Sequence, residues 1–98
     1  MKERDIEHRL MAGVKKLGGV AYKFTAPGRR SVPDRLCVLP FGLICFVECK
    51  RPGGHVTHLQ VREIAKLREF GHWVCVADSF ESTDSILTEM KALIDKKN

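Results

Sequence analysis

Three residues of the chain could together carry out metal-assisted chemistry: Asp34, Glu48 and Lys50. They bracket a predicted β-hairpin whose register sets Asp34 directly opposite Glu48, and Lys50 projects from the same face two residues later. Carboxylates in opposite positions of an antiparallel pair stand about 4.5–5.5 Å apart at Cβ and repel each other, so folding gives no reason for this pair. A divalent cation bound by hard oxygen ligands would turn the repulsion into attraction.

Hydrolysis of a phosphodiester is the reaction that such a cluster suits. A Mg²⁺ ion held by two carboxylates stabilises negative charge on the phosphoryl oxygens and lowers the pKa of bound water. We expect Asp34 and Glu48 to be the side-chain ligands, with the backbone carbonyl of Cys49 as a third. Lys50 would orient or deprotonate the attacking water, or neutralise the phosphate. The structural alternative is a surface ion pair between Lys50 and one of the acids, worth about 0–1 kcal/mol.

The register follows from the turn. Residues 40–42, Pro-Phe-Gly, have the composition of a three-residue hairpin loop in which Gly42 takes a positive φ. Pairing of Leu39 with Leu43 across this loop fixes every other pair in the two arms, which are rich in aliphatic, cysteine and phenylalanine residues. The hairpin is therefore the element that positions the three polar residues.

The remaining pattern predicts an α/β (α+β) fold in the order α-β-β-β-α-β-α. Apolar residues at helical spacing predict a first helix over 4–17, a helix that Thr57 caps and that runs to Phe70, and a last helix around residues 86–94. We expect strands at 20–25 and 73–77 besides the hairpin, and a polar turn at 78–83. The three early strands would form a meander, and a helical crossover would bring the last strand into a mixed four-stranded sheet flanked by helices.

Basic residues near these elements suggest contact with a polyanion. Two arginines in the loop before Asp34 suit phosphate contact or an ordinary solvated turn equally well. Positive charge near the first turn of the second helix opposes the helix dipole, which hints at an anionic partner. The candidate nucleic-acid-binding residues are Arg29, Arg30, Arg35, Arg51, His55, His58 and Arg62.

The length and composition of the chain indicate a single domain. The chain has 98 residues, 44% of them hydrophobic, which suffices for a single domain over residues 1–98. Its formal net charge of +5 favours a nucleic-acid partner. No run is apolar enough for a signal peptide or a membrane span, and four cysteines without a CxxC spacing suggest reduced, buried thiols, so we expect an intracellular, cytoplasmic protein.

The order of elements and the polar residues together resemble the PD-(D/E)xK nuclease superfamily. More narrowly, Glu7 in the first helix, Pro33-Asp34, Glu48-Cys49-Lys50 and Gln60 in the next helix are similar to the VRR-NUC (virus-type replication-repair nuclease) family. From the residues alone, Glu7 is a solvated acid at the edge of the apolar stripe, and Gln60 closes a Thr-x-x-Gln capping box. The resemblance implies that both also lie at the catalytic site.

The resemblance further implies a stand-alone phage or prophage nuclease that cleaves DNA with Mg²⁺ or Mn²⁺. It implies a likeness to Holliday junction resolvases, which cut branched or structured DNA as homodimers with two sites; in a phage-encoded protein, the place of action is the bacterial host cell. Two other classes stay open: a non-catalytic nucleic-acid-binding module, and a zinc-binding interaction domain built on Cys37, Cys45, Cys49 and Cys75.

Overall fold

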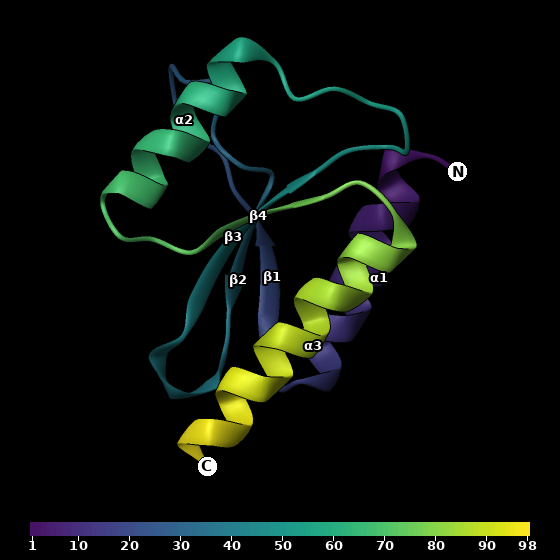
Figure 1. Cartoon of the computed structure of the whole chain (residues 1–98), viewed down its shortest axis with the longest axis vertical. Helices are drawn as coiled ribbons and strands as arrows, with labels where there is room; N and C mark the ends of the chain where they lie inside the picture. The colour runs from purple at the N-terminus through teal and green to yellow at the C-terminus, as the bar shows by residue number, and fades with distance from the viewer.

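The structure is a computed structural model that describes all of residues 1–98. It contains three helices, α1 (Glu3–Lys16), α2 (His58–Glu69) and α3 (Phe80–Lys97). The strands are β1 (Val20–Lys23), β2 (Arg35–Val38), β3 (Ile44–Cys49) and β4 (Val74–Ala77), and a short 3₁₀ turn, η1 (Pro40–Gly42), joins β2 to β3. The predicted order α-β-β-β-α-β-α is confirmed, and Figure 1 shows the elements packed as one body.

The four strands form one mixed sheet in the order β1-β2-β3-β4. The pairs β1–β2 and β2–β3 are antiparallel, and β4 lies parallel to β3 because α2 carries the chain back across the sheet. The predicted meander with one crossover strand is therefore confirmed. None of the helices has the length and apolar content that a membrane crossing requires.

The hairpin has the predicted register. Val38 pairs with Ile44, Arg35 pairs with Val47, and the backbone N–H of Leu39 donates to the carbonyl of Leu43 at 2.8 Å. Extending this register by one position sets Asp34 beside Glu48, at the end of the sheet opposite the turn.

The turn itself carries one surprise. Gly42 has a φ of +74°, as expected, but Phe41 also has a positive φ, +63°. This left-handed conformation costs an L-residue about 1–2 kcal/mol. The phenylalanine ring is 54% exposed, so burial of the ring gives little in return.

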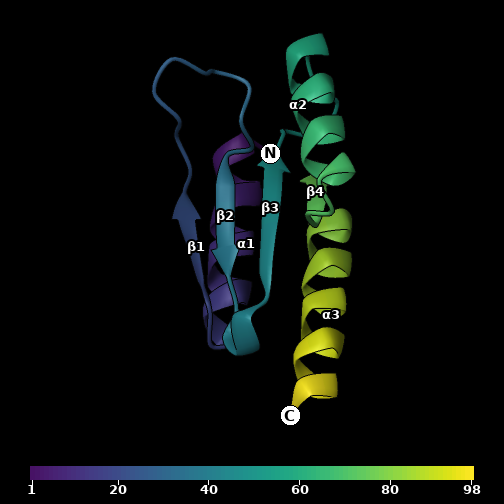
Figure 2. The same cartoon turned by 90° about the vertical axis from the view of Figure 1, so that its left-hand side faces the viewer.

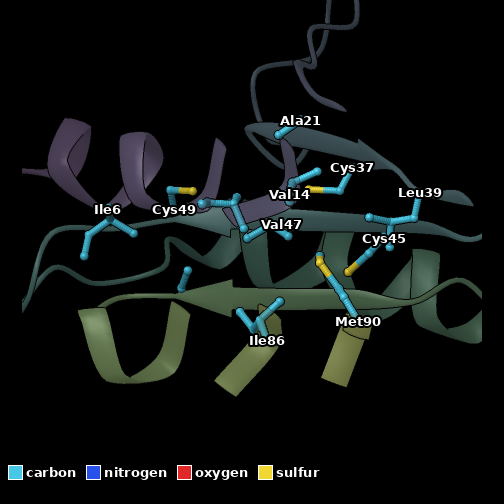
Figure 3. Close-up of a cluster of buried hydrophobic side chains, with 12 residues drawn as sticks. Ile6, Val14, Ala21, Cys37, Leu39, Cys45, Val47, Cys49, Ile86 and Met90 are labelled. Atoms are coloured by element: carbon cyan, nitrogen blue, oxygen red, sulfur yellow. The ribbon is translucent and has the colours of Figure 1, made fainter. Parts of the chain in front are cut away.

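The core lies between the sheet and the pair α1 and α3 (Figure 1). Alternate residues of the central strands point into it, as the period of two requires. Twelve buried side chains form the cluster, and Figure 3 shows aliphatic and sulfur-containing groups of the strands meeting those of α1 and α3. All four cysteines are free thiols, and three of them are buried.

The opposite face of the sheet is covered only at one end, by α2. Figure 2 shows β1, β2 and β3 with no helix in front of them, and with α1 behind. The outward residues there are apolar and exposed: Val20 48%, Tyr22 56%, Val38 38% and Ile44 48%. We call these four residues the open sheet face.

The helix ends follow local rules, with one correction. The predicted polar turn at 78–83 is wrong beyond Ser79, because α3 begins at Phe80. Ser79 is the N-cap: its hydroxyl accepts from the N–H of Ser82 at 2.9 Å, and its carbonyl accepts from the Thr83 hydroxyl at 2.6 Å. Short polar side chains that suit a turn equally suit a helix cap, so composition alone did not separate the two. The predicted strand at 20–25 also ends earlier, at Lys23.

Candidate active site

Asp34 and Glu48 face each other at one end of the β2–β3 pair. The backbone N–H of Asp34 donates to Glu48 Oε1 at 3.2 Å, and the backbone N–H of Cys49 donates to Asp34 Oδ2 at 2.8 Å. Each carboxyl group therefore accepts a backbone N–H from the opposite strand end, Glu48 from Asp34 itself and Asp34 from Cys49. Asp34 and Glu48 therefore lie side by side, as the predicted register requires.

Glu48 is the most constrained residue of the cluster. It is 1% exposed, and Oε2 accepts from Gln60 Nε2 at 2.6 Å and lies 3.5 Å from Lys50 Nζ. The pKa of Glu48 is raised to about 7, chiefly by burial and then by the charge of Asp34, whereas the charge of Lys50 lowers it. Burial and the charge of Asp34 thus make ionisation of Glu48 costly, which favours its protonated form.

The backbone of Cys49 adds a third oxygen. In extended chain, the N–H and C=O of one residue point toward the same neighbouring strand. Because the Cys49 N–H donates to Asp34, its carbonyl is also directed to the β2 side of the strand. The next residue, Lys50, donates its N–H in the other direction, to the carbonyl of Ala77 in β4 at 2.9 Å.

Gln60 reaches the cluster from the first turn of α2. Thr57 caps this helix as predicted: Gln60 N–H donates to the Thr57 hydroxyl at 3.2 Å, and Gln60 Oε1 accepts from the Thr57 N–H at 2.9 Å. The other end of the same amide donates to Glu48. The Gln60 side chain thus caps the start of α2 and also holds the Glu48 carboxylate.

Glu7 approaches from α1, on the same side as Asp34. Both residues line one cavity of about 410 Å³, but Glu7 is also ion-paired to Arg35, with Oε1 3.0 Å from Nε. Arg35 is 13% exposed and donates a further bond to the Ala21 carbonyl at 3.3 Å. The Arg35 guanidinium thus holds Glu7 in place and is committed to contacts within the protein.

Two acids that the sequence did not single out belong to this region. Glu3 lines the same cavity as Glu7, one helical turn away, and its pKa is raised by burial and by the charge of Asp34. The spacing of four residues between Glu3 and Glu7 was the available signal. Glu63 in α2 is buried and pairs with Arg29, 2.6 Å from Oε1 to Nη2. Arg29 and Glu63 are 34 positions apart in the sequence, and no local pattern links them.

The other basic candidates are spread over the surface. Arg29 and Arg30 line the cavity that contains Asp34, and Arg62 lies on α2 near Arg29. Arg51 and His55 are exposed in the segment between β3 and α2, and His58 is exposed at the start of α2. The structure therefore places Arg29 with Arg30 in one cavity and with Arg62 in another, and Arg51, His55 and His58 line neither.

The donors suit a hard cation and not zinc. No three side chains among histidine, cysteine, aspartate and glutamate converge in a way that could hold a metal ion. The four cysteines thus form no zinc site, although Cys45 and Cys75 lie 3.9 Å apart at sulfur. Two carboxylates and a carbonyl oxygen, completed by water, are the kind of set that Mg²⁺ and Mn²⁺ accept.

Comparison with known proteins finds similarity both in sequence and in structure. The sequence matches no family model. It is 54% identical over 87 residues to "Putative nuclease p44" of Acyrthosiphon pisum secondary endosymbiont phage 1, an alignment that covers 89% of this chain and 92% of that protein. The fold is similar to a solved "VRR_NUC domain" with a TM-score of 0.79 and 32% identity, over 90% of this chain and 96% of that one.

Proposed function

The chain belongs to the VRR-NUC family of nucleases, and from this premise we propose that it is a metal-dependent endonuclease that cuts DNA. The observation that carries the proposal is the hydrogen-bonded pair of Asp34 and Glu48, beside Lys50, at the end of the β2–β3 hairpin. Nucleic acid is the substrate of a nuclease; the choice of DNA, the metal and the site residues are our proposal.

Mg²⁺ or Mn²⁺ is the cofactor that this donor set supports best. Asp34 and Glu48 would hold it with one oxygen each, together with the Cys49 carbonyl. The charge of Asp34 raises the pKa of Glu48, so this is a place where excess negative charge needs compensation. A cation held by these residues would lower the pKa of a coordinated water and neutralise charge on the phosphoryl oxygens.

The other residues of the site act on this core in distinct ways. Gln60 holds Glu48 through Oε2 and so fixes the orientation of its carboxylate. Lys50 is 16% exposed, so its ammonium can reach solvent and orient or deprotonate the attacking water, or pair with the phosphate. Glu7, held by Arg35, adds negative charge on the α1 side of Asp34.

We propose a preference for branched or structured DNA, cut by a homodimer with two sites, as in a Holliday junction resolvase. The support for the dimer is the open sheet face, because contiguous exposed apolar side chains on a sheet mark a protein interaction surface. A two-fold pairing of this face would bring two copies of the hairpin together. The free cysteines and the phage relative support action in the cytoplasm of a bacterial host.

A cleavage panel tests the enzymatic proposal. Duplex, flap, splayed and four-way substrates are incubated with Mg²⁺, with Mn²⁺ and with EDTA. We expect Asp34→Asn and Glu48→Gln each to abolish cleavage and Lys50→Ala to slow it strongly, while circular dichroism stays native. Arg9→Ala is the control, because Arg9 pairs with Asp84 on the α1–α3 side.

The second candidate is a binding module that cuts nothing. It predicts shifted DNA bands without products under every metal condition, whereas a nuclease gives products that EDTA removes. Full cleavage by the Asp34→Asn variant would overturn the assignment of the site.

A further inference from the structure

A basic pocket lies between α2 and the loop that joins β1 to β2. We call it the loop pocket; it has a volume of about 370 Å³. Figure 2 shows the loop and α2 standing beyond the same end of the sheet, the end where β2 begins and β3 stops. The lining residues are Arg29, Ser31, Leu59, Arg62, Glu63 and Lys66. Three cations thus face one carboxylate and a single apolar residue.

The helical part of this lining is one stripe of α2. Residues 59, 62, 63 and 66 are separated by three and four positions, so they share the helix face that is turned to the loop. Arg62 and Lys66 are both exposed, and neither has a salt-bridge partner. Their charges are therefore available to a ligand.

Glu63 is the exception, because it is 8% exposed and is committed to Arg29. Its Oε1 accepts from Arg29 Nη2 at 2.6 Å and from Nε at 3.2 Å. The Arg29 side chain remains 53% exposed, and its two side-chain hydrogen bonds use Nε and Nη2, which leaves Nη1 free. The buried carboxylate thus fixes a guanidinium whose free edge points to an accessible surface.

Arg29 connects the loop pocket to the catalytic cluster. It also lines the cavity of about 410 Å³ that contains Asp34, together with Lys23 and Arg30. A line of cations therefore leads from Asp34 past Arg29 to Arg62 and Lys66. Such a line matches the regular negative charge of a nucleic-acid backbone, which Arg and Lys contact without reading sequence.

We propose that the loop pocket holds the phosphodiester backbone of the substrate next to the position that is cut. Arg29, Arg62 and Lys66 contact phosphates, and Glu63 is a positioning residue that orders Arg29. The inference deepens the proposed function and rests on it, since the backbone is that of the nuclease substrate.

Binding of fluorescein-labelled duplex and four-way DNA, measured by anisotropy over a salt series, tests the contacts. All variants carry Asp34→Asn and are kept in EDTA, so that no strand is cut. Arg62→Ala and Lys66→Ala each remove one phosphate contact and should flatten the slope of log affinity against log salt by about 0.9. Arg9→Ala removes a cation on the α1–α3 side and should leave the slope unchanged.

A second set tests the positioning role of Glu63. Glu63→Gln should weaken DNA binding by about threefold, because Arg29 keeps its charge but loses the partner that orders it for phosphate contact. In a chain that already carries Arg29→Ala, adding Glu63→Gln should not weaken DNA binding further, because the arginine that Glu63 positions is absent. With Asp34 restored and Mg²⁺ present, Glu63→Gln should raise KM and leave kcat unchanged.

The outcomes separate the inference from the proposed function. If Arg62→Ala and Lys66→Ala bind as Arg9→Ala does, the loop pocket is not the binding surface, even where the wild type cleaves DNA. If Glu63→Gln weakens binding equally with and without Arg29, the positioning role is wrong. If these variants lose binding and the wild type cuts nothing with any metal, the pocket stands and the nuclease site fails.

Discussion

Raising the pH from about 5 to about 8 should destabilise the metal-free protein, because Glu48 must lose its proton inside the fold. Burial and the charge of Asp34 raise the pKa of Glu48 from 4.5 to about 7. Between these values the folded chain keeps a proton that the unfolded chain has released. A group whose pKa is raised by folding contributes stability below its unfolded pKa, and this stability is lost as the pH rises through the folded value.

The size of the effect follows from the shift. Each pKa unit corresponds to about 1.4 kcal/mol, so the loss has a ceiling of about 3 kcal/mol in the free energy of unfolding. Saturating Mg²⁺ should restore the loss, because it compensates the charge of the ionised pair. The increase in Tm on adding Mg²⁺ should therefore be larger at about pH 8 than at about pH 5.5.

Chemical denaturation in EDTA and in Mg²⁺, over a pH series, measures both effects. Asp34→Asn removes the neighbouring charge, so its pH slope should be smaller and its response to Mg²⁺ lost. Asp84→Asn is the matched control, since Asp84 is an exposed carboxylate paired with Arg9. A stability that is flat or rises over this pH range in EDTA, or an Asp34→Asn slope equal to that of the wild type, would refute the reasoning.

Three further predictions concern other residues. Gln60→Ala and Thr57→Ala both break the capping box, and each should cost about 1 kcal/mol in the free energy of unfolding. Only Gln60→Ala also removes a hydrogen bond to Glu48, so only this variant should lower the rate of cleavage at saturating substrate. Equal cleavage rates for the two variants would mean that Gln60 acts only as a helix cap. Lys50→Ala should slow single-turnover cleavage by about 10²–10⁴-fold, the usual contribution of a group that transfers or positions a proton, and should leave Tm within a few degrees of the wild type. A rate loss of less than about tenfold would show that Lys50 has no part in the mechanism. Val38→Lys places a charge in the open sheet face and should convert the proposed dimer into a monomer in light scattering; a wild-type protein that is already monomeric at working concentration contradicts the dimer.

The hairpin and its polar end were predictable because two local rules act together. A three-residue turn fixes the register, and a period of two then assigns each side chain to a face, so Asp34 and Glu48 could be paired without a structure. The start of α2 was predictable for the same kind of reason, since Thr57 and Gln60 satisfy each other within one turn.

Interactions between distant segments were not predictable. Arg29 and Glu63 meet across 34 positions of sequence, and nothing near either residue indicates the other. The left-handed φ of Phe41 was missed because such conformations are rare outside glycine, asparagine and aspartate. The start of α3 at Phe80 was missed because serine and threonine serve turns and caps alike.

Anomalous diffraction from a crystal grown with Mn²⁺ tests the central claim most directly. We expect one peak between β2 and β3, in contact with an oxygen of Asp34 and an oxygen of Glu48, and no peak in crystals of Asp34→Asn. Manganese density elsewhere, with these two carboxylates empty in a protein that cleaves DNA under the same conditions, would contradict the account.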